Sequence, residues 1–432
     1  MNPKILFLSE IEERLLQFGQ PFMHFLSFAG FHSVVIKTGS SEGLKYQSFA
    51  LPWAILNLTL LILGETFYTI VIHPTVRAKY NLGLTENFTY ILVSFSTVLS
   101  FLALKALAIL KYKENSKFWS ENVRMLMEFS QVGPQFDLRS EHLDPFFETI
   151  RQGVRRNLIA GLFYMFYCMI IVCALIWIAV ANDSKDFPLL ISNLHHVQSL
   201  IWNINFSMYF LFGLFLGLYL KMYITCLQVI AIEVERIVIT QNREAMLSNN
   251  KDIELGPKTI FKKQFNMEQT IERLEQILKA YFITEELVTK FSRHFETELF
   301  ITFVSSFLII FARAFFIVYY ILKSSPTDAL YMTGTAVVYV WQIYHVATLC
   351  SQLDEQVKRI LVFLHRVDVK ALPIYLHTKI DMLAVRLAGE PLTISPRQCF
   401  KLDRKLLITM LASVATYLII LIQFQTADER GP

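Results

Sequence analysis

The chain has 432 residues, of which 54% are hydrophobic, 14% are aromatic and only 18% are charged, and its formal net charge is +4. Soluble globular domains carry about 25% charged residues, and here the apolar residues come in long blocks, which excludes an ordinary soluble protein. The five cysteines show no CxxC spacing, so we expect neither a disulfide framework nor a metal site.

Seven blocks are long and apolar enough to be membrane-spanning helices. They cover residues 50–73, 87–110, 157–181, 198–224, 299–322, 330–350 and 405–424. The block 21–36 is too short to span, and we expect a re-entrant or interfacial segment there, or part of the packed core. Acidic residues interrupt the first 20 positions, so no cleavable signal peptide is expected. The sequence predicts an all-α membrane protein.

The distribution of Lys and Arg predicts the orientation of these helices. Most of the 40 basic residues lie in the N-terminal segment and in the loops after the second, fourth and sixth blocks. We therefore expect a multi-pass plasma-membrane protein with its N-terminus in the cytosol and its C-terminus outside. This orientation is the reverse of a G-protein-coupled receptor. The basic loops follow the positive-inside rule and can touch anionic lipid, so they do not indicate nucleic acid.

The long inner loops are expected to be helical extensions of the membrane helices. Residues 266–293 place apolar side chains at helical spacing, and residues 351–370 continue the sixth block in the same way. The predicted organisation has six segments. A cytosolic N-terminal segment covers residues 1–49, and the first four helices with their inner extensions cover 50–240. A linker, 241–265, precedes the fifth and sixth helices, which with their long cytosolic extensions cover 266–404. The last helix covers 405–424, and an extracellular tail covers 425–432.

The last block, 405–424, divides into two faces on a helical wheel. Small and polar residues gather on one side, whereas a helix surrounded by lipid has no reason to separate them. This pattern fits either pore lining or close packing on a neighbouring helix. The small and polar face contains Thr409, Ala412, Ser413, Thr416, Ile420 and Gln423, in line with Lys405.

Charged and aromatic residues inside the blocks are the candidates for a small-molecule pocket. Lys105 and Lys221 lie near inner ends, where their side chains are expected to extend to the interface. Glu65 and Arg313 lie deeper, and we expect them to pair, to serve a pocket or to lock the structure. The outer halves of the blocks also hold aromatic, amide and hydroxyl groups, which suit a small-molecule pocket or an interfacial aromatic belt. The candidate ligand-binding residues are Tyr90, Trp177, Trp202, Asn203, Arg313, Tyr319, Tyr320, Thr335 and Tyr339.

No catalytic constellation or phosphate-binding loop is present, so we expect no enzyme activity, no cofactor and no metal. His195 and His196 are adjacent and would point to different sides of a helix, which makes a poor metal pair. The sequon at Asn182 falls in a predicted outside loop and is a candidate glycosylation site.

The C-terminal sequence resembles one known family. Thr416-Tyr417, five apolar residues and then Gln423-Phe424 are similar to the TYhhhhhQF signature (h, apolar) of insect gustatory receptors, which are related to insect odorant receptors. Phe400, Arg404 and Leu406-Leu407 before the signature also match the family. The resemblance implies a tetrameric, ligand-gated, non-selective cation channel. The last helix of each subunit would line the pore, and an inner anchor of helix extensions would hold the tetramer.

Carried over to this chain, the resemblance implies a gate at Gln423 and Phe424. The helical wheel places Thr416 and Ile420 on the same face as Gln423, and we expect them to line the pore as well. The expected partners are a small-molecule tastant, permeating cations, membrane lipid and other subunits of the same or a related receptor. The tastant is expected to be either a sugar or a bitter compound. The alternatives are a secondary transporter or a metabotropic seven-helix receptor, although a transporter would be expected to show broken helices or internal repeats.

Overall fold

The structure is a computed structural model, and it is almost wholly helical where it describes the chain. It describes residues 36–37, 45–46, 50–67, 84–132, 189–249, 257–323, 326–369, 372–389 and 392–429, together with isolated helical positions between 148 and 170. The strands are two-residue segments, β1 (Ile36–Lys37) and β2 (Lys45–Tyr46), paired antiparallel. The candidate segment at 21–36 lies outside the described residues apart from its last position.

Six of the seven predicted blocks form helices. These helices are α2 (Ala50–Phe67), α4 (Leu84–Leu110), α7 (Leu189–Asn249), α9 (Glu296–Leu322), α10 (Pro326–Leu364) and α12 (Arg404–Glu429). The block 157–181 lies mostly outside the described residues. By length and composition, two described stretches could cross a bilayer, Tyr209–Arg243 and Glu296–Leu322, and two shorter apolar stretches lie in α2 and α4.

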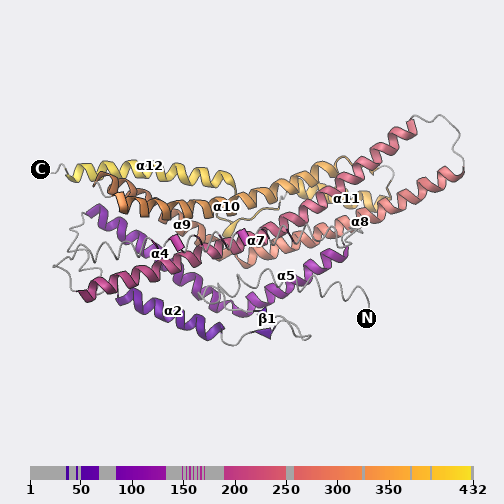
Figure 1. Ribbon diagram of the computed structural model, residues 1–432. Helices are drawn as coiled ribbons and strands as arrows, with labels where there is room; N and C mark the ends of the chain where they lie inside the picture. Colours follow the sequence, from indigo (N-terminus) through magenta and orange to yellow (C-terminus); the bar gives the residue numbers. More distant parts are fainter. Residues whose placement is uncertain are drawn as a thin grey trace.

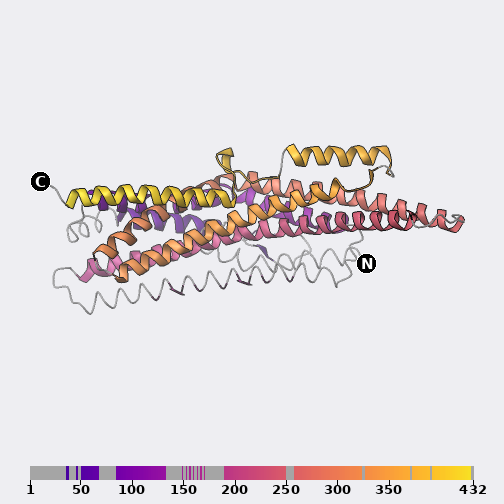
Figure 2. The ribbon, with the colours of Figure 1, turned by 90° about the horizontal axis from the view of Figure 1, so that it is seen from above.

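The molecule is elongated, and α7 and α10 run along both of its halves (Figure 1). We call one half the apolar end; it consists of α2, α4, α9, α12 and the first parts of α7 and α10. The other half, the charged end, holds α5 (Tyr112–Val132), α8 (Pro257–His294), α11 (Ile374–Gly389) and the second parts of α7 and α10. Seen from above, α12 and α11 lie one after the other along the same side (Figure 2).

The helix boundaries differ from the predicted organisation at the linker, before the fifth block and at the carboxyl end, where α12 continues to Glu429 in the predicted tail 425–432. Helix α7 continues to Asn249 and α8 begins at Pro257, so much of the predicted linker 241–265 is helical. Proline at the first position of a helix is favourable because its missing N–H has no partner there in any case. Residues 266–293 approach the fifth block without a loop, but a single break at Phe295 separates α8 from α9.

One continuous core connects the two ends. Along α7 it includes Leu214, Tyr223, Leu227 and Val234, all fully buried or nearly so. In the predicted amphipathic stretch of α8, Leu274, Ile277, Leu278, Tyr281, Leu287 and Val288 are buried, as the apolar spacing indicates. Of the other apolar residues in this pattern, Ile271 is half-buried and Phe282 is 45% exposed. For the part of the core in α8, burial of apolar area contributes about 25 cal/mol per Å², whereas helices surrounded by lipid are held together by close packing.

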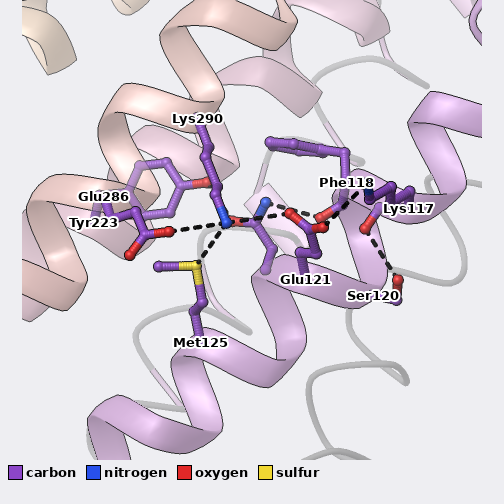
Figure 3. A network of polar contacts seen from close by, with 9 residues as sticks. Lys117, Phe118, Ser120, Glu121, Met125, Tyr223, Glu286 and Lys290 are labelled. Carbon is purple, nitrogen blue, oxygen red and sulfur yellow. Dashed lines mark hydrogen bonds and ion pairs between the residues drawn. The ribbon is translucent and has the colours of Figure 1, made fainter.

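Ion pairs bind the helices of the charged end to one another. Lys290 of α8 lies 3.2 Å from Glu121 of α5 and 3.0 Å from Glu286 on its own helix, and its ammonium sits between the two carboxylates (Figure 3). The hydrogen bond with Glu286, together with Glu121, raises the pKa of Lys290. Beside this network, the hydroxyl of Tyr223 donates to Asn122 Oδ1 at 2.6 Å. Helix α5 is therefore fixed to both α8 and α7.

Candidate functional site: a polar interior and an outward-facing last helix

Arg313 is a buried cation in the middle of α9, one of the most apolar helices. Its Nη1 contacts the sulfur of Met332 on α10, and its guanidinium lies 5.8 Å from the ring of Tyr331. The hydroxyl of Thr335 donates to the Met332 carbonyl at 2.9 Å. Arg313 and Thr335, both candidate pocket residues, are thus brought to one region of the contact between α9 and α10. A charge here is expensive to bury, which makes Arg313 a candidate for the pocket or for a structural lock.

Tyr319 and Tyr320 belong to an aromatic cluster at the same end of α9. Their ring centroids are 5.3 Å apart, and Tyr319 is buried together with Phe315 and Phe316. Two side chains from other helices pack on this cluster, Met332 of α10 and Leu418 of α12. Because Met332 also contacts Arg313, the cluster joins the candidate pocket residues directly to the last helix.

Tyr339 lies one helical turn beyond Thr335, in a second polar region. Its ring is 5.9 Å from that of Tyr209 on α7. The Tyr209 hydroxyl lies 2.8 Å from Ser305 Oγ and 3.2 Å from Ser306 Oγ, and it donates to the Thr302 carbonyl at 2.9 Å. These groups are buried and come from three helices, α7, α9 and α10.

The sequence analysis missed several residues of this interior. Gln342, only 1% exposed, donates from Nε2 to the Tyr209 carbonyl at 3.4 Å. It fits because α7 has Gly213 opposite it, where a Cβ atom would lie 2.2 Å from Gln342 Nε2. Gly217 faces His345 in the same way. The Gly213-x-x-x-Gly217 spacing, which allows close helix approach, was a usable signal.

Lys105 corrects one expectation. Its side chain does not extend to the interface but is 1% exposed, between α4 and α2, and its Nζ lies 3.4 Å from Asn57 Oδ1. Asn57 of α2 meets Lys105 in the C-terminal part of α4, and a position along one helix cannot show which neighbour will cover it.

Some candidate residues cannot be placed. Tyr90 lies in α4, and Trp202 and Asn203 lie in α7, but their side chains are outside the described part of the structure. Trp177 and the sequon residue Asn182 lie outside the described residues altogether. The same applies to the side chain of Phe424.

Helix α12 packs on the subunit along one narrow stripe. Leu407 and Val414 are buried, and Leu406, Met410 and Leu418 are partly buried against the core. The opposite side, which we call the outward face, is exposed and consists of Lys405, Thr409, Ala412, Thr416, Ile420 and Gln423. At about 100° per residue these six positions fall within about 80° of one another, roughly opposite the stripe. Ser413 lies at the edge of the outward face and is half-buried.

The hydroxyls on and beside the outward face donate to their own helix. Thr409 donates to the Lys405 carbonyl at 3.1 Å, Ser413 to Thr409 at 2.9 Å and Thr416 to Ala412 at 3.0 Å. A hydroxyl has one proton and two acceptor lone pairs. With the proton used inside the helix, each oxygen presents acceptors to the surroundings.

The segment before α12 is attached to both α9 and α10. Arg397 and Gln398 have positive φ angles, 49° and 55°, which are unfavourable for residues other than glycine. Arg397 Nη2 donates to Thr297 Oγ1 at 3.1 Å, and the ring of Phe400 lies 6.0 Å from that of Phe300. Lys401 lies 3.2 Å from Asp354 of α10. The amino end of α12, which the proposal below places on the inner side, is therefore firmly held.

No group of three or more potential metal ligands occurs among the described residues. The described parts of α7, α9, α10 and α12 are also unbroken through their apolar stretches, whereas many transporters carry broken helices near the membrane midplane.

Comparisons with known proteins agree with the seven-helix organisation. The family model described as "7tm Chemosensory receptor" matches residues 20–428. No curated protein sequence matches the chain. Among solved structures, the insect olfactory receptor OR5 from Machilis hrabei superimposes with a TM-score of 0.60 at 16% identity, covering 96% of this chain and 99% of that one. The same receptor in complex with eugenol gives a TM-score of 0.58 at 16% identity, covering 97% and 99%.

At 16% identity the solved structures show only that the fold is shared. Membership of the family is shown by the family model, which spans nearly the whole chain. The family and its structural neighbours are receptors rather than enzymes, which agrees with the missing catalytic constellation. The resemblance to insect gustatory and odorant receptors is thereby confirmed at the level of the family. The chain belongs to the seven-transmembrane chemosensory receptor family.

Proposed function

We propose that the protein is a gustatory receptor of the plasma membrane that acts as a tastant-gated, non-selective cation channel. Four subunits form the channel, and α12 of each lines a central pore. The N-terminus lies in the cytosol, so the charged end is cytosolic and the C-terminal end of α12 faces outside. The observation that carries the proposal is the outward face of α12. It turns threonine, alanine and glutamine side chains away from the subunit, although α12 is an apolar helix of a membrane receptor.

The chemistry of this face suits cations. The acceptor lone pairs of Thr409 and Thr416 can replace part of the water around a cation, and no acidic side chain is present to bind one tightly. Conduction needs sites that are favourable enough to enter and weak enough to leave. Ile420, which is 40% exposed, supplies an apolar ring that closes the resting pore by excluding water.

The charged end is suited to hold the subunits together. Helix α11 is attached to α8 by the pair Arg386–Glu285 at 2.9 Å, but Ile374, Met382 and Val385 on its other side are 82%, 68% and 73% exposed. Apolar exposure of this extent on a cytosolic helix indicates an interface. A second copy of the chain covers this surface in the tetramer.

Gating follows from the contacts of α9. A tastant between α9 and α10, near Arg313 and Tyr319, changes the packing of the aromatic cluster on which Leu418 rests. Phe311 of α9 also packs edge-on against Tyr417 of α12, with ring centroids 6.2 Å apart. Because the inner end of α12 is held, only the outer half of the helix can turn about its own axis. This rotation moves Ile420 away from the pore axis, where it lies in the resting state, and brings Gln423 toward it in the open state. A tastant drives this change only by its difference in affinity between the two states.

The pocket favours a tastant of low charge. The described candidate residues are one arginine with tyrosines and a threonine, and no carboxylate is among them. Aromatic faces with few polar groups suit a bitter compound, and a sugar remains within the proposed range. OR5 is described in complex with eugenol, and a small aromatic molecule is a reasonable first member of a test panel.

Cysteine accessibility tests the proposal. Cysteines are introduced singly at Thr409, Thr416, Ile420 and Gln423 on the outward face, and at Leu407 and Val414 on the packed stripe as matched controls. A charged thiol reagent applied during tastant-evoked current should change the current at the outward positions alone. Modification that is independent of the tastant at positions 420 and 423 would refute the gating motion, and modification that is equal on both faces would refute the pore assignment.

A further inference from the structure

We propose that Lys405 forms a ring of positive charge at the cytosolic mouth of the pore, which limits outward current and disfavours divalent cations. The inference rests on the proposed function, because it needs four copies of α12 around one axis. It goes beyond that function in naming a residue that sets rectification and ion preference.

The position of Lys405 is the first observation. It is exposed, and it lies in the first turn of α12 on the outward face. Gln423 follows 18 residues later, which is about five turns of helix, so the two residues share one line along α12. The carbonyl of Lys405 accepts the hydroxyl of Thr409, the next residue of the outward face. A pore lined by Thr416 and Gln423 therefore ends at Lys405 on its inner side.

The neighbouring charges do not neutralise Lys405. Asp354 Oδ2 pairs with the ammonium of Lys358 at 3.0 Å and with that of Lys401 at 3.2 Å. Asp403 uses Oδ1 to accept the backbone N–H of Leu406 at the start of α12. None of the ion pairs among the described residues involves Lys405, and its neighbour Arg404 adds a second exposed cation. Net charge at this end of α12 is positive.

Stability does not account for a lysine at this position. The amino end of a helix carries partial positive charge, so acidic residues are favourable in the first turn and basic ones are unfavourable. The first turn of α12 contains no acidic residue. A lysine that is exposed, unfavourably placed for the helix and aligned with the predicted conduction path is more readily explained by an effect on permeating ions.

The expected effect follows from the local ion concentration. Four ammonium groups around a water-filled mouth raise the potential there, with a reach of about 8 Å at physiological ionic strength. The concentration of monovalent cations at the mouth falls by a few-fold, and that of divalent cations falls by about the square of this factor. Cations entering from the cytosol meet this barrier first, so outward current is smaller than inward current.

Current–voltage curves in symmetrical sodium solutions test the inference on the full-length chain. For tastant-evoked current, Lys405→Gln should reduce the ratio of inward to outward current by about two- to fivefold, and Lys405→Glu should reverse the asymmetry. The permeability of calcium relative to sodium should rise in the same order. Lys117→Gln removes the same charge from an exposed position on α5 and should leave the curve unchanged.

A thiol version separates charge from folding. In a Cys399→Ser background, which removes the one exposed thiol among the described residues, Lys405→Cys is treated from the cytosolic side with a cationic or an anionic thiol reagent. The cationic reagent should restore the wild-type asymmetry and the anionic one should invert it. If the ratio of inward to outward tastant-evoked current changes neither with the substitution nor with the reagent, the role of Lys405 is overturned, while the channel proposal stands. A ligand-binding wild-type chain that conducts no ions would overturn both.

Discussion

The ammonium of Lys111 lies 2.9 Å and 3.0 Å from the two carboxylate oxygens of Glu298, and it also donates to the His294 carbonyl at 2.7 Å. Lys111 occupies the break between α4 and α5, and His294 precedes the break between α8 and α9. The ring of His294 stacks on Phe118 with centroids 4.3 Å apart. Lys111, Glu298 and His294 therefore hold the two helix breaks together at the border between the apolar and the charged ends, and we call these three residues the clasp.

Breaking this clasp should destabilise the receptor strongly. Glu298→Gln leaves the ammonium of Lys111 without its counter-charge in a largely buried site, and removal of one partner of a buried pair costs about 3–5 kcal/mol. The melting temperature of the detergent-solubilised receptor measures the effect. The exposed pair Lys279–Glu128 is the control, since its removal through Glu128→Gln should cost under about 1 kcal/mol. Equal losses at both sites would contradict the role of the clasp.

The close approach of α7 and α10 should make Gly213 intolerant of a side chain. In Gly213→Ala the new Cβ would lie 2.2 Å from Gln342 Nε2 and 2.8 Å from its Cδ, so the glutamine must move and lose its contact with Tyr209. Overpacking of this kind costs about 1–3 kcal/mol. Gln342→Ala in the same chain should recover much of the loss in melting temperature. Gly389→Ala, which meets nothing within 4 Å, is the matched control.

These two features also show where prediction from the sequence ends. The apolar blocks were visible because a spanning helix needs about 20 apolar residues. The breaks at Lys111 and Phe295 carry no glycine or proline, and they depend on partners far away in the sequence. The contact of Gln342 with Gly213 likewise depends on how α7 and α10 cross. Helix α11 was assigned only to a longer extension, since its apolar face is short and half exposed.

The candidate site divides in the same way. The wheel pattern of 405–424 placed the small and polar residues on one side, and the structure leaves that side exposed. Arg313, Tyr319, Tyr320 and Thr335 were selected by residue type, and the structure brings them near the contact of α9 with α10. Tyr209, Ser305 and Ser306 escaped notice because isolated hydroxyls in an apolar block look like ordinary helix residues. The role of the wheel face of 405–424 in the pore, and the roles of Arg313, Tyr319, Tyr320 and Thr335 in the pocket, stay predictions.

Asp354 should make the receptor sensitive to acid. Burial alone would raise the pKa of its carboxyl, but hydrogen bonds from Lys358 and Lys401 outweigh burial and lower it. A lowered pKa in the folded state contributes stability that is present above the unfolded pKa and is lost as pH falls through the folded pKa. Asp354→Asn should therefore lower the melting temperature at pH 7, and the difference from wild type should shrink below about pH 4. A difference that stays constant down to pH 3 would contradict this account.

Contacts between α9 and α12 should transmit gating without binding the tastant. Leu418→Ala removes the α12 side chain that rests on the aromatic cluster. We expect a smaller maximal current, with tastant affinity in a direct binding assay changed by less than about threefold, because the deleted group is on α12 and not between α9 and α10. Ile408→Ala is the control, since Ile408 is 68% exposed on α12. Loss of tastant binding in Leu418→Ala would place this residue in the pocket instead.

The central claim is that this chain by itself converts tastant binding into cation flow. The most direct measurement uses the purified chain in liposomes that carry a cation indicator, without any G protein. A panel of sugars, bitter compounds and small aromatic molecules is first screened for a rise in melting temperature, which identifies ligands that bind. The account predicts that a binding tastant opens a cation flux, and that cysteine modification at Gln423 alters it. A tastant that stabilises the chain but evokes no flux, or transport of the tastant itself across the liposome, would contradict the account.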